Sequence, residues 1–94
     1  MKLEIEVTQE DIDKGVRSNP YKCPYSNAVK RLFSKAFQVY THSHYDPQSG
    51  VWWSCAVSSW GGHISFELKG DLASKARRFD ETGEMQPFKF EVEI

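Results

Sequence analysis

The first two elements of the fold are predicted by one stretch of sequence, Leu3-Glu-Ile-Glu-Val-Thr-Gln-Glu-Asp-Ile-Asp-Lys-Gly15. Its first five residues alternate apolar and acidic side chains, which predicts a strand with one buried face. Thr8 follows this strand and can cap a helix, and Asp11 lies at the position that closes a capping box. Gly15 can end the helix. The segment therefore predicts a strand at residues 2–7 and a short helix at residues 8–15.

A second helix begins at Cys23-Pro24, because proline suits the first turn of a helix. From Pro24 to about Phe37, apolar residues recur at helical spacing and predict a buried stripe: Ala28, Val29, Leu32, Phe33 and Ala36. The basic residues Lys30, Arg31 and Lys35 lie off that stripe.

The middle of the chain reads as three consecutive antiparallel strands. Strand formers at residues 37–41 lead to the turn signal Asp46-Pro47-Gln-Ser-Gly50, and a return strand follows at residues 51–57. A second turn at 58–62 precedes an alternating strand at 63–68. In the return strand the alternation predicts one face toward the core (Val51, Trp53, Cys55 and Val57) and one away from it (Trp52, Ser54, Ala56 and Ser58).

The C-terminal part predicts a helix and a last strand. Asp71 is a natural N-cap for a helix at 72–81, with Leu72, Ala76 and Phe79 buried, and Gly83 ends it. From Phe88 to Ile94 apolar residues alternate with charged ones. The order β-α-α-β-β-β-α-β predicts one α+β domain over residues 1–94, a mostly antiparallel sheet of about five strands with two to three helices on one face.

The two terminal strands each have an apolar face, so we expect them to lie side by side. Their outward residues would then form an acidic patch, diluted by Lys2 and Lys89, from Glu4, Glu6, Glu91 and Glu93. Such a patch is either an ordinary solvated sheet face or a docking surface for a basic partner.

Both ends of the chain resemble a family of small uncharacterised proteins of phages and prophages. The N-terminal motif is Val7-Thr8-x-x-Asp11-Ile12-x-x-Gly15 followed by Cys23-Pro24-x-x-x-Ala28, and the C-terminal one is Ala76-Arg77-Arg78-Phe79-Asp80-x-x-Gly83. Tyr25-Ser26-Asn27 stands where the family has small aliphatic residues. The resemblance implies the family's fold and a viral origin, and it brings no catalytic residues.

Composition narrows the class of protein. The net charge is −1, which favours neither a strongly basic nucleic-acid binder nor an acidic nucleic-acid mimic. There is no apolar run near 18 residues and no signal-like N-terminus. We therefore expect a protein of the host-cell cytoplasm without membrane association. Two cysteines, Cys23 and Cys55, are too few for a disulfide framework, so we expect buried free thiols.

Chemistry-bearing residues are sparse. His42 and His44 would share a strand face, and Cys23, Cys55 or His63 could in principle complete a zinc site. The paired spacings of structural zinc sites are missing, so we predict no metal and no cofactor. Cys23 at a helix N-terminus could be a nucleophile, but the sequence places no base beside it. A small enzyme is therefore only the second alternative.

Large rings remain as the best candidates for a function. Trp52, Trp60, Tyr40, Tyr45 and Tyr25 cannot all be buried in 94 residues, and such rings often anchor interfaces. We predict a protein partner bound through Tyr40, Tyr45, Trp52 and Trp60. With the viral resemblance, this suggests a stoichiometric inhibitor or modulator of host machinery, such as a CRISPR-type defence complex. The alternative is a single-strand nucleic-acid-binding accessory protein, with Lys30, Arg31 and Lys35 near the rings.

Overall fold

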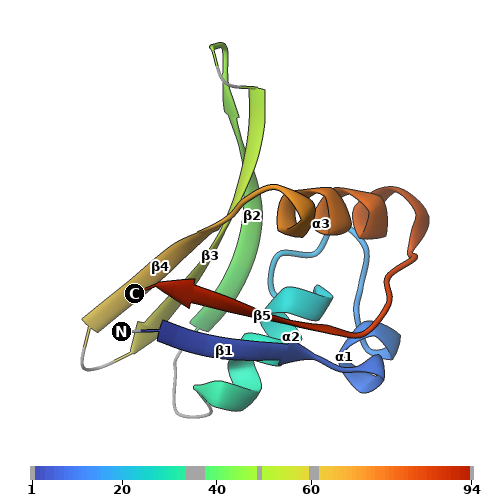
Figure 1. The fold of residues 1–94 in the computed structure, drawn as a ribbon, viewed down its shortest axis with the longest axis vertical. Helices are drawn as coiled ribbons and strands as arrows, with labels where there is room; N and C mark the ends of the chain where they lie inside the picture. Colours follow the sequence, from blue (N-terminus) through green and yellow to red (C-terminus); the bar gives the residue numbers. More distant parts are fainter. Residues whose placement is uncertain (1, 34–37, 49, 60–61, 94) are drawn as a thin grey trace.

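The computed structural model describes residues 2–33, 38–48, 50–59 and 62–93, and these ranges contain five strands and three helices (Figure 1). The order β-α-α-β-β-β-α-β agrees with the prediction. In chain order the elements are β1 (Lys2–Val7), α1 (Gln9–Asp13), α2 (Pro24–Leu32), β2 (Gln38–Asp46), β3 (Gly50–Ser59), β4 (Gly62–Leu68), α3 (Asp71–Thr82) and β5 (Phe88–Glu93).

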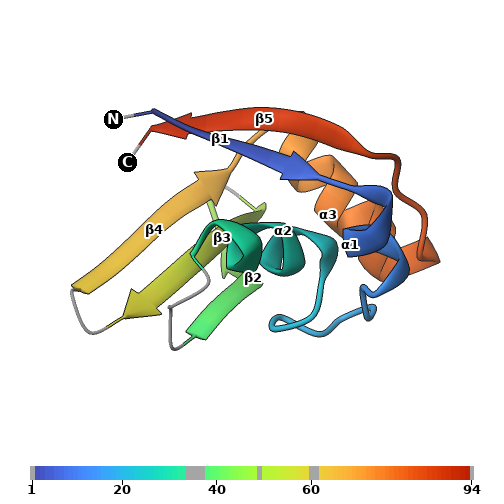
Figure 2. The ribbon, with the colours of Figure 1, turned by 90° about the horizontal axis from the view of Figure 1, so that it is seen from below.

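The strands form two antiparallel sheets, which refines the predicted single sheet within the confirmed α+β class. β2, β3 and β4 form the predicted meander, whereas β1 pairs with β5 as a separate ribbon. Figure 2 shows the ribbon and the meander on different sides of α2, and α2 contacts both β1 and β2. Each sheet therefore turns an apolar face toward the same core, and one continuous sheet is not needed to bury both.

Tyr25 lies at the centre of this core and is 1% exposed. Its ring meets Phe88 and Phe90 of β5 edge-on, with centroid distances of 5.8 and 5.6 Å. Its hydroxyl donates to the main-chain oxygen of Leu72 at 2.7 Å. Of the five large rings that cannot all be buried, Tyr25 is one that the core encloses, because a buried phenol that finds an acceptor loses little by leaving water.

The helix ends agree with the sequence patterns at most positions. Thr8 and Asp11 form the predicted capping box, and Gly83 ends α3 in the left-handed region with φ +78°. Asp71, however, is the first residue of α3 and not its N-cap. Gly70 takes that place with φ +57°, a conformation that glycine adopts without strain. Asp71 still lies in the first turn, where a carboxylate favours the helix dipole.

The second helix is shorter than predicted. α2 ends at Leu32, and Phe33 is already non-helical with φ −116° and ψ +57°. Leu32 is 48% exposed, so its place in the buried stripe is wrong. Of the other predicted members of the stripe, Ala28 and Val29 are buried, and Phe33 is partly buried against the core. Ala36 and Lys35 fall outside the described residues.

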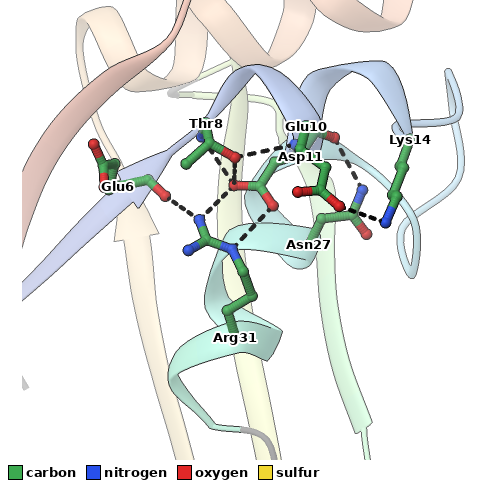
Figure 3. A network of polar contacts seen from close by, with 7 residues as sticks. All are labelled: Glu6, Thr8, Glu10, Asp11, Lys14, Asn27 and Arg31. Carbon is green, nitrogen blue, oxygen red and sulfur yellow. Dashed lines mark hydrogen bonds and ion pairs between the residues drawn. The ribbon is translucent and has the colours of Figure 1, made fainter.

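A polar network fastens β1, α1 and α2 together (Figure 3). The Asp11 carboxylate is almost fully buried and accepts from the Thr8 main-chain N–H at 2.9 Å and from the Arg31 guanidinium at 2.6 Å. Arg31 also donates to the main-chain oxygen of Glu6 at 2.7 Å, and Asn27 donates to that of Asp11 at 3.1 Å. We call these residues the Asp11 network. It holds the first helix onto the second one.

Gly15 follows α1 at a position that leaves no room for a side chain. A Cβ there would lie 2.9 Å from Cζ of Phe79, 3.0 Å from the Ile12 oxygen and 3.0 Å from Cδ of Pro24. These distances are shorter than ordinary van der Waals contacts. Glycine thus allows the end of α1 to approach α3 and the start of α2 closely.

Candidate interaction surface on the hairpin

The β2–β3 hairpin extends beyond the rest of the molecule. Figure 1 shows its distal part rising past α3, and we call residues 43–48 and 50–53 the hairpin arm. At its tip the Gln48 N–H donates to the Asp46 carboxylate at 2.9 Å, and Gly50 has φ +84°. Both are features of a tight turn, as the sequence predicted.

One face of the arm continues the core-facing side of the meander, and we call it the inner face. Tyr45 and Val51 are paired on it and are 75% and 58% exposed. The prediction that Val51 belongs to the core is therefore wrong. Cys55 and Val57, closer to the base of the same strand, are buried as predicted, and Trp53 is partly buried against the core. The side-chain alternation is correct, but the arm extends beyond the elements that cover this face.

The opposite, outer face carries a row of five rings. Centroid distances along it are 6.1 Å from Tyr21 to Tyr40, 5.1 Å from Tyr40 to His42 and 4.1 Å from His42 to His44. His44 stacks on Trp52 at 3.9 Å with 15° between the planes. The two-residue spacing of Tyr40, His42 and His44 was the signal for this row, whereas the contribution of Tyr21 comes from the loop before α2.

Two histidines lie in the middle of the row. Burial, and then the nearby His44, lower the pKa of His42. The His44 ring shares a hydrogen bond with the Ser54 hydroxyl at 2.8 Å. Within the part of the chain that the structure describes, no three His, Cys, Asp or Glu side chains are grouped to hold a metal ion.

The outer face bears no lysine or arginine among the residues described on β2, β3 and β4, where it presents mainly serine, histidine and aromatic side chains. The predicted basic neighbours on α2 are occupied by other contacts. Lys30 donates to the main-chain oxygen of Tyr21 at 2.7 Å, and Arg31 belongs to the Asp11 network. Lys35 is outside the described residues. The described residues of these strands therefore provide no basic side chains beside the rings.

A cavity of about 280 Å³, partly open to solvent, lies at the base of the arm. Ser43 and Trp53, paired across β2 and β3, adjoin the Tyr45–Val51 pair and line this cavity. The inner face of the arm thus leads directly into it. The other lining residues come from the loop before α2, the start of α2, β2, α3 and the segment after α3: Ser18, Asn19, Pro20, Cys23, Pro24, Tyr25, Thr41, His42, Ala76, Phe79, Asp80 and Met85.

Both cysteines are buried free thiols, as expected. Cys23 caps α2, its sulfur accepting from the Ser26 N–H at 3.5 Å. Burial raises the pKa of Cys55 to about 12, against a smaller lowering by a hydrogen bond with Thr41. Cys23 and His42 both line the cavity, but the His42 ring packs against Tyr40 and His44. Among the described residues we see no contact that would pair a thiol with a base.

The terminal ribbon carries the predicted acidic patch. Glu4 lies directly opposite Glu91, and both are exposed. Glu6 faces Lys89 across the ribbon, and Lys2 faces Glu93, so the two lysines interrupt the carboxylates as anticipated.

The structure distributes the predicted binding residues over both faces of the arm. Tyr45 is on the inner face, while Trp52 (37% exposed) and the partly buried Tyr40 are on the outer one. Trp60 lies outside the described residues. None of the described helices is long and apolar enough to span a membrane. Comparisons of the chain with protein-family models, curated proteins and solved structures find no match.

Proposed function

We propose that the protein binds another protein through the hairpin arm and acts stoichiometrically, as an inhibitor or modulator. The exposure of Tyr45 and Val51, on an arm that extends past the core, carries this proposal. Trp52 adds a large ring on the other face. A solvated hairpin does not need these side chains, since the turn type and the loop length fix its register.

The chemistry of the arm favours a protein partner over a charged polymer. Tyr and Trp supply large contact areas with few rotatable bonds, and they often dominate the binding energy of interfaces. The chain is close to neutral overall. The partner would therefore be held chiefly by the burial of apolar surface, with weak dependence on salt.

The resemblance to phage and prophage proteins directs the proposal toward host machinery in the cytoplasm. Small phage proteins that lack enzymatic motifs frequently block or redirect such machinery by binding it. A nucleic-acid-guided defence complex of the CRISPR type is the most specific target that we propose. This step rests on analogy between families, whereas the binding surface rests on the residues of the arm.

The test is affinity capture from bacterial lysate, followed by reconstitution of the captured complex from purified components. Tyr45→Ala and Trp52→Ala should each weaken the reconstituted complex by roughly 2 kcal/mol, or about thirtyfold in Kd. Leu32→Ala is the matched control, because Leu32 is a similarly exposed apolar residue on α2. Equal affinity of the partner for all three variants would show that the arm is not part of the interface.

The row of rings on the outer face supports a second candidate, binding of single-stranded nucleic acid. Bases stack on such rings in many single-strand binders. Against it, the described strand residues of this face include no lysine or arginine to contact phosphates. Fluorescence anisotropy with a labelled single strand decides between the two. Tight binding that falls steeply with added salt would favour the nucleic acid.

A further inference from the structure

We propose that the cavity at the base of the hairpin arm receives an arginine side chain of the partner protein. The inference deepens the proposed function and rests on it. It begins from the position of the cavity, which adjoins the exposed Tyr45–Val51 pair through Ser43 and Trp53. A polypeptide segment packed against Tyr45 and Val51 would therefore have the cavity mouth within reach of its next side chains.

The size of the cavity limits what it can hold. Ligand pockets for drug-sized molecules run from roughly 300 to 1,000 Å³. At about 280 Å³ this cavity falls just below that range. It suits one long side chain better than a nucleotide or a large cofactor.

The charge of the lining selects a cation. Among the described residues that line the cavity, Asp80 is the only acidic one, and none is a lysine or an arginine. It comes from the same face of α3 as Ala76 and Phe79, at helical spacing. Its carboxylate accepts one hydrogen bond, from the Ser18 N–H at 3.0 Å. Among the described residues, no ion pair involves Asp80.

Arg17 lies close by but is directed elsewhere. Its Nε donates to the main-chain oxygen of Asp80 at 3.1 Å, and its terminal nitrogen donates to that of Glu81. It does not line the cavity. The Asp80 carboxylate thus keeps acceptor sites for an incoming donor, since an ionised carboxylate can accept about four hydrogen bonds.

The remaining lining fits arginine better than lysine. Trp53 and Met85 contribute an aromatic residue and a flexible apolar one to the lining. Guanidinium groups stack on aromatic rings, and their planar donors match a carboxylate in pairs. The hydroxyl groups of Ser18 and Ser43 are further acceptors for a group with five N–H donors, as is the Asn19 amide oxygen, which also accepts from the Tyr21 N–H at 3.0 Å. An ammonium group would use fewer of these partners.

The experiment titrates the purified full chain with N-acetyl-arginine amide and follows the Trp53 indole N–H by NMR, assigned with Trp53→Phe. We expect saturable shifts with a Kd on the order of 1 mM, the affinity of one well-placed side chain. N-acetyl-citrulline amide has the same shape without the charge and should not saturate. N-acetyl-lysine amide should bind several-fold more weakly than the arginine derivative.

Asp80→Asn should weaken arginine binding about tenfold while preserving the fold, because the amide oxygen can still accept from Ser18. Glu81→Gln is the matched control, since it removes the same charge one position away, at an exposed site outside the lining. Equal binding of citrulline and arginine, or an Asp80→Asn affinity like that of the unchanged chain, overturns the inference.

The reconstituted complex separates this inference from the proposed function. If Trp52→Ala and Tyr45→Ala weaken the complex but Asp80→Asn does not, the partner uses the arm and the arginine inference fails. If the arginine derivative binds as expected but no complex depends on the arm, the cation cavity stands and the proposed function fails. Loss of binding with Asp80→Asn in both assays supports both.

Discussion

The Asp11 network and the hairpin arm reverse the usual distribution of side chains, because the network buries a carboxylate and the arm exposes large apolar residues. In the network a buried carboxylate is surrounded by donors from Thr8 and Arg31, so polar groups stabilise the fold. In the arm, apolar side chains such as Tyr45 and Val51 remain largely exposed to water and contribute little to the stability of the isolated chain. The network therefore contributes to the stability of the fold, whereas the exposed side chains of the arm are the ones that we propose for binding.

The largest effect should come from a charge placed in the body of the fold. Phe79→Asp puts a carboxylate at a position that is 3% exposed, and we expect a loss of about 5 kcal/mol or more in the free energy of unfolding. That is enough to unfold many domains of this size. Leu32→Asp, at a 48% exposed site, should change it by about 0.5 kcal/mol or less. Circular dichroism during urea unfolding measures both, and similar losses would refute the assigned burial.

The next largest loss of stability should come from removing the charge of Asp11. Burial alone would raise the pKa of Asp11, but hydrogen bonds from Arg31 and Thr8 outweigh it and hold the pKa below its usual value of 3.8. Asp11→Asn should therefore cost about 1.5–3 kcal/mol at pH 7, as expected for hydrogen bonds to a charged group. Asp13→Asn, an exposed change on the same helix, is the control.

The pH dependence has a definite sign. Because the folded-state pKa of Asp11 is lowered, its stabilisation is complete above the unfolded pKa near 3.8 and is lost as pH falls through the folded value. The difference in stability between the unchanged chain and Asp11→Asn should thus shrink below about pH 4. A constant difference down to acid unfolding would show that the charge is unimportant.

A smaller loss is expected at the close contact beside the network. Gly15→Ala introduces a Cβ at 2.9–3.0 Å from Phe79, Ile12 and Pro24, and should cost about 1–3 kcal/mol. Val16→Ala, at the next position and 45% exposed, should stay within about 0.5 kcal/mol. Thermal unfolding of the two variants measures this difference in stability. If Gly15→Ala is as stable as Val16→Ala, the approach of α1 to α3 is looser than described.

The smallest effect on stability should come from the arm. Tyr45→Ala should alter the free energy of unfolding by about 0.5 kcal/mol or less, and Trp52→Ala by about 1 kcal/mol, because Trp52 also stacks on His44. Hydrogen exchange of the β2–β3 amides should remain unchanged at the base of the hairpin. A global loss of protection in either variant would place these rings in the folding core and remove the contrast with the Asp11 network.

Much of the local architecture followed from short sequence patterns. The Thr8–Asp11 capping box, the turn at Asp46-Pro47 and the left-handed end of α3 at Gly83 all depend on residues a few positions apart. Caps and turns are local chemistry, so a single sequence reveals them. The N-cap of α3 was misplaced by one residue, because Gly70 and Asp71 both suit a helix start.

The burial of individual side chains was harder to predict, because it depends on which other elements of the fold pack against them. Tyr25 is buried since Leu72, 47 residues away, accepts its hydroxyl and the strand β5 covers its ring. Val51 continues the correct face of β3, yet it is exposed because the arm extends past the helices. The alternation of side chains along a strand shows which residues share a face, but it does not show which element packs against that face.

The sequence by itself determined the order of the elements, the register signals of the meander and the pairing tendency of the terminal strands, because these follow from periodicity and turn chemistry. Only the tertiary structure decided the division into two sheets, the row of rings completed by Tyr21, and the cavity that Asp80 and Trp53 both line. These arrangements join residues distant in the chain. Their positions are set by packing around a shared core, which no local pattern encodes.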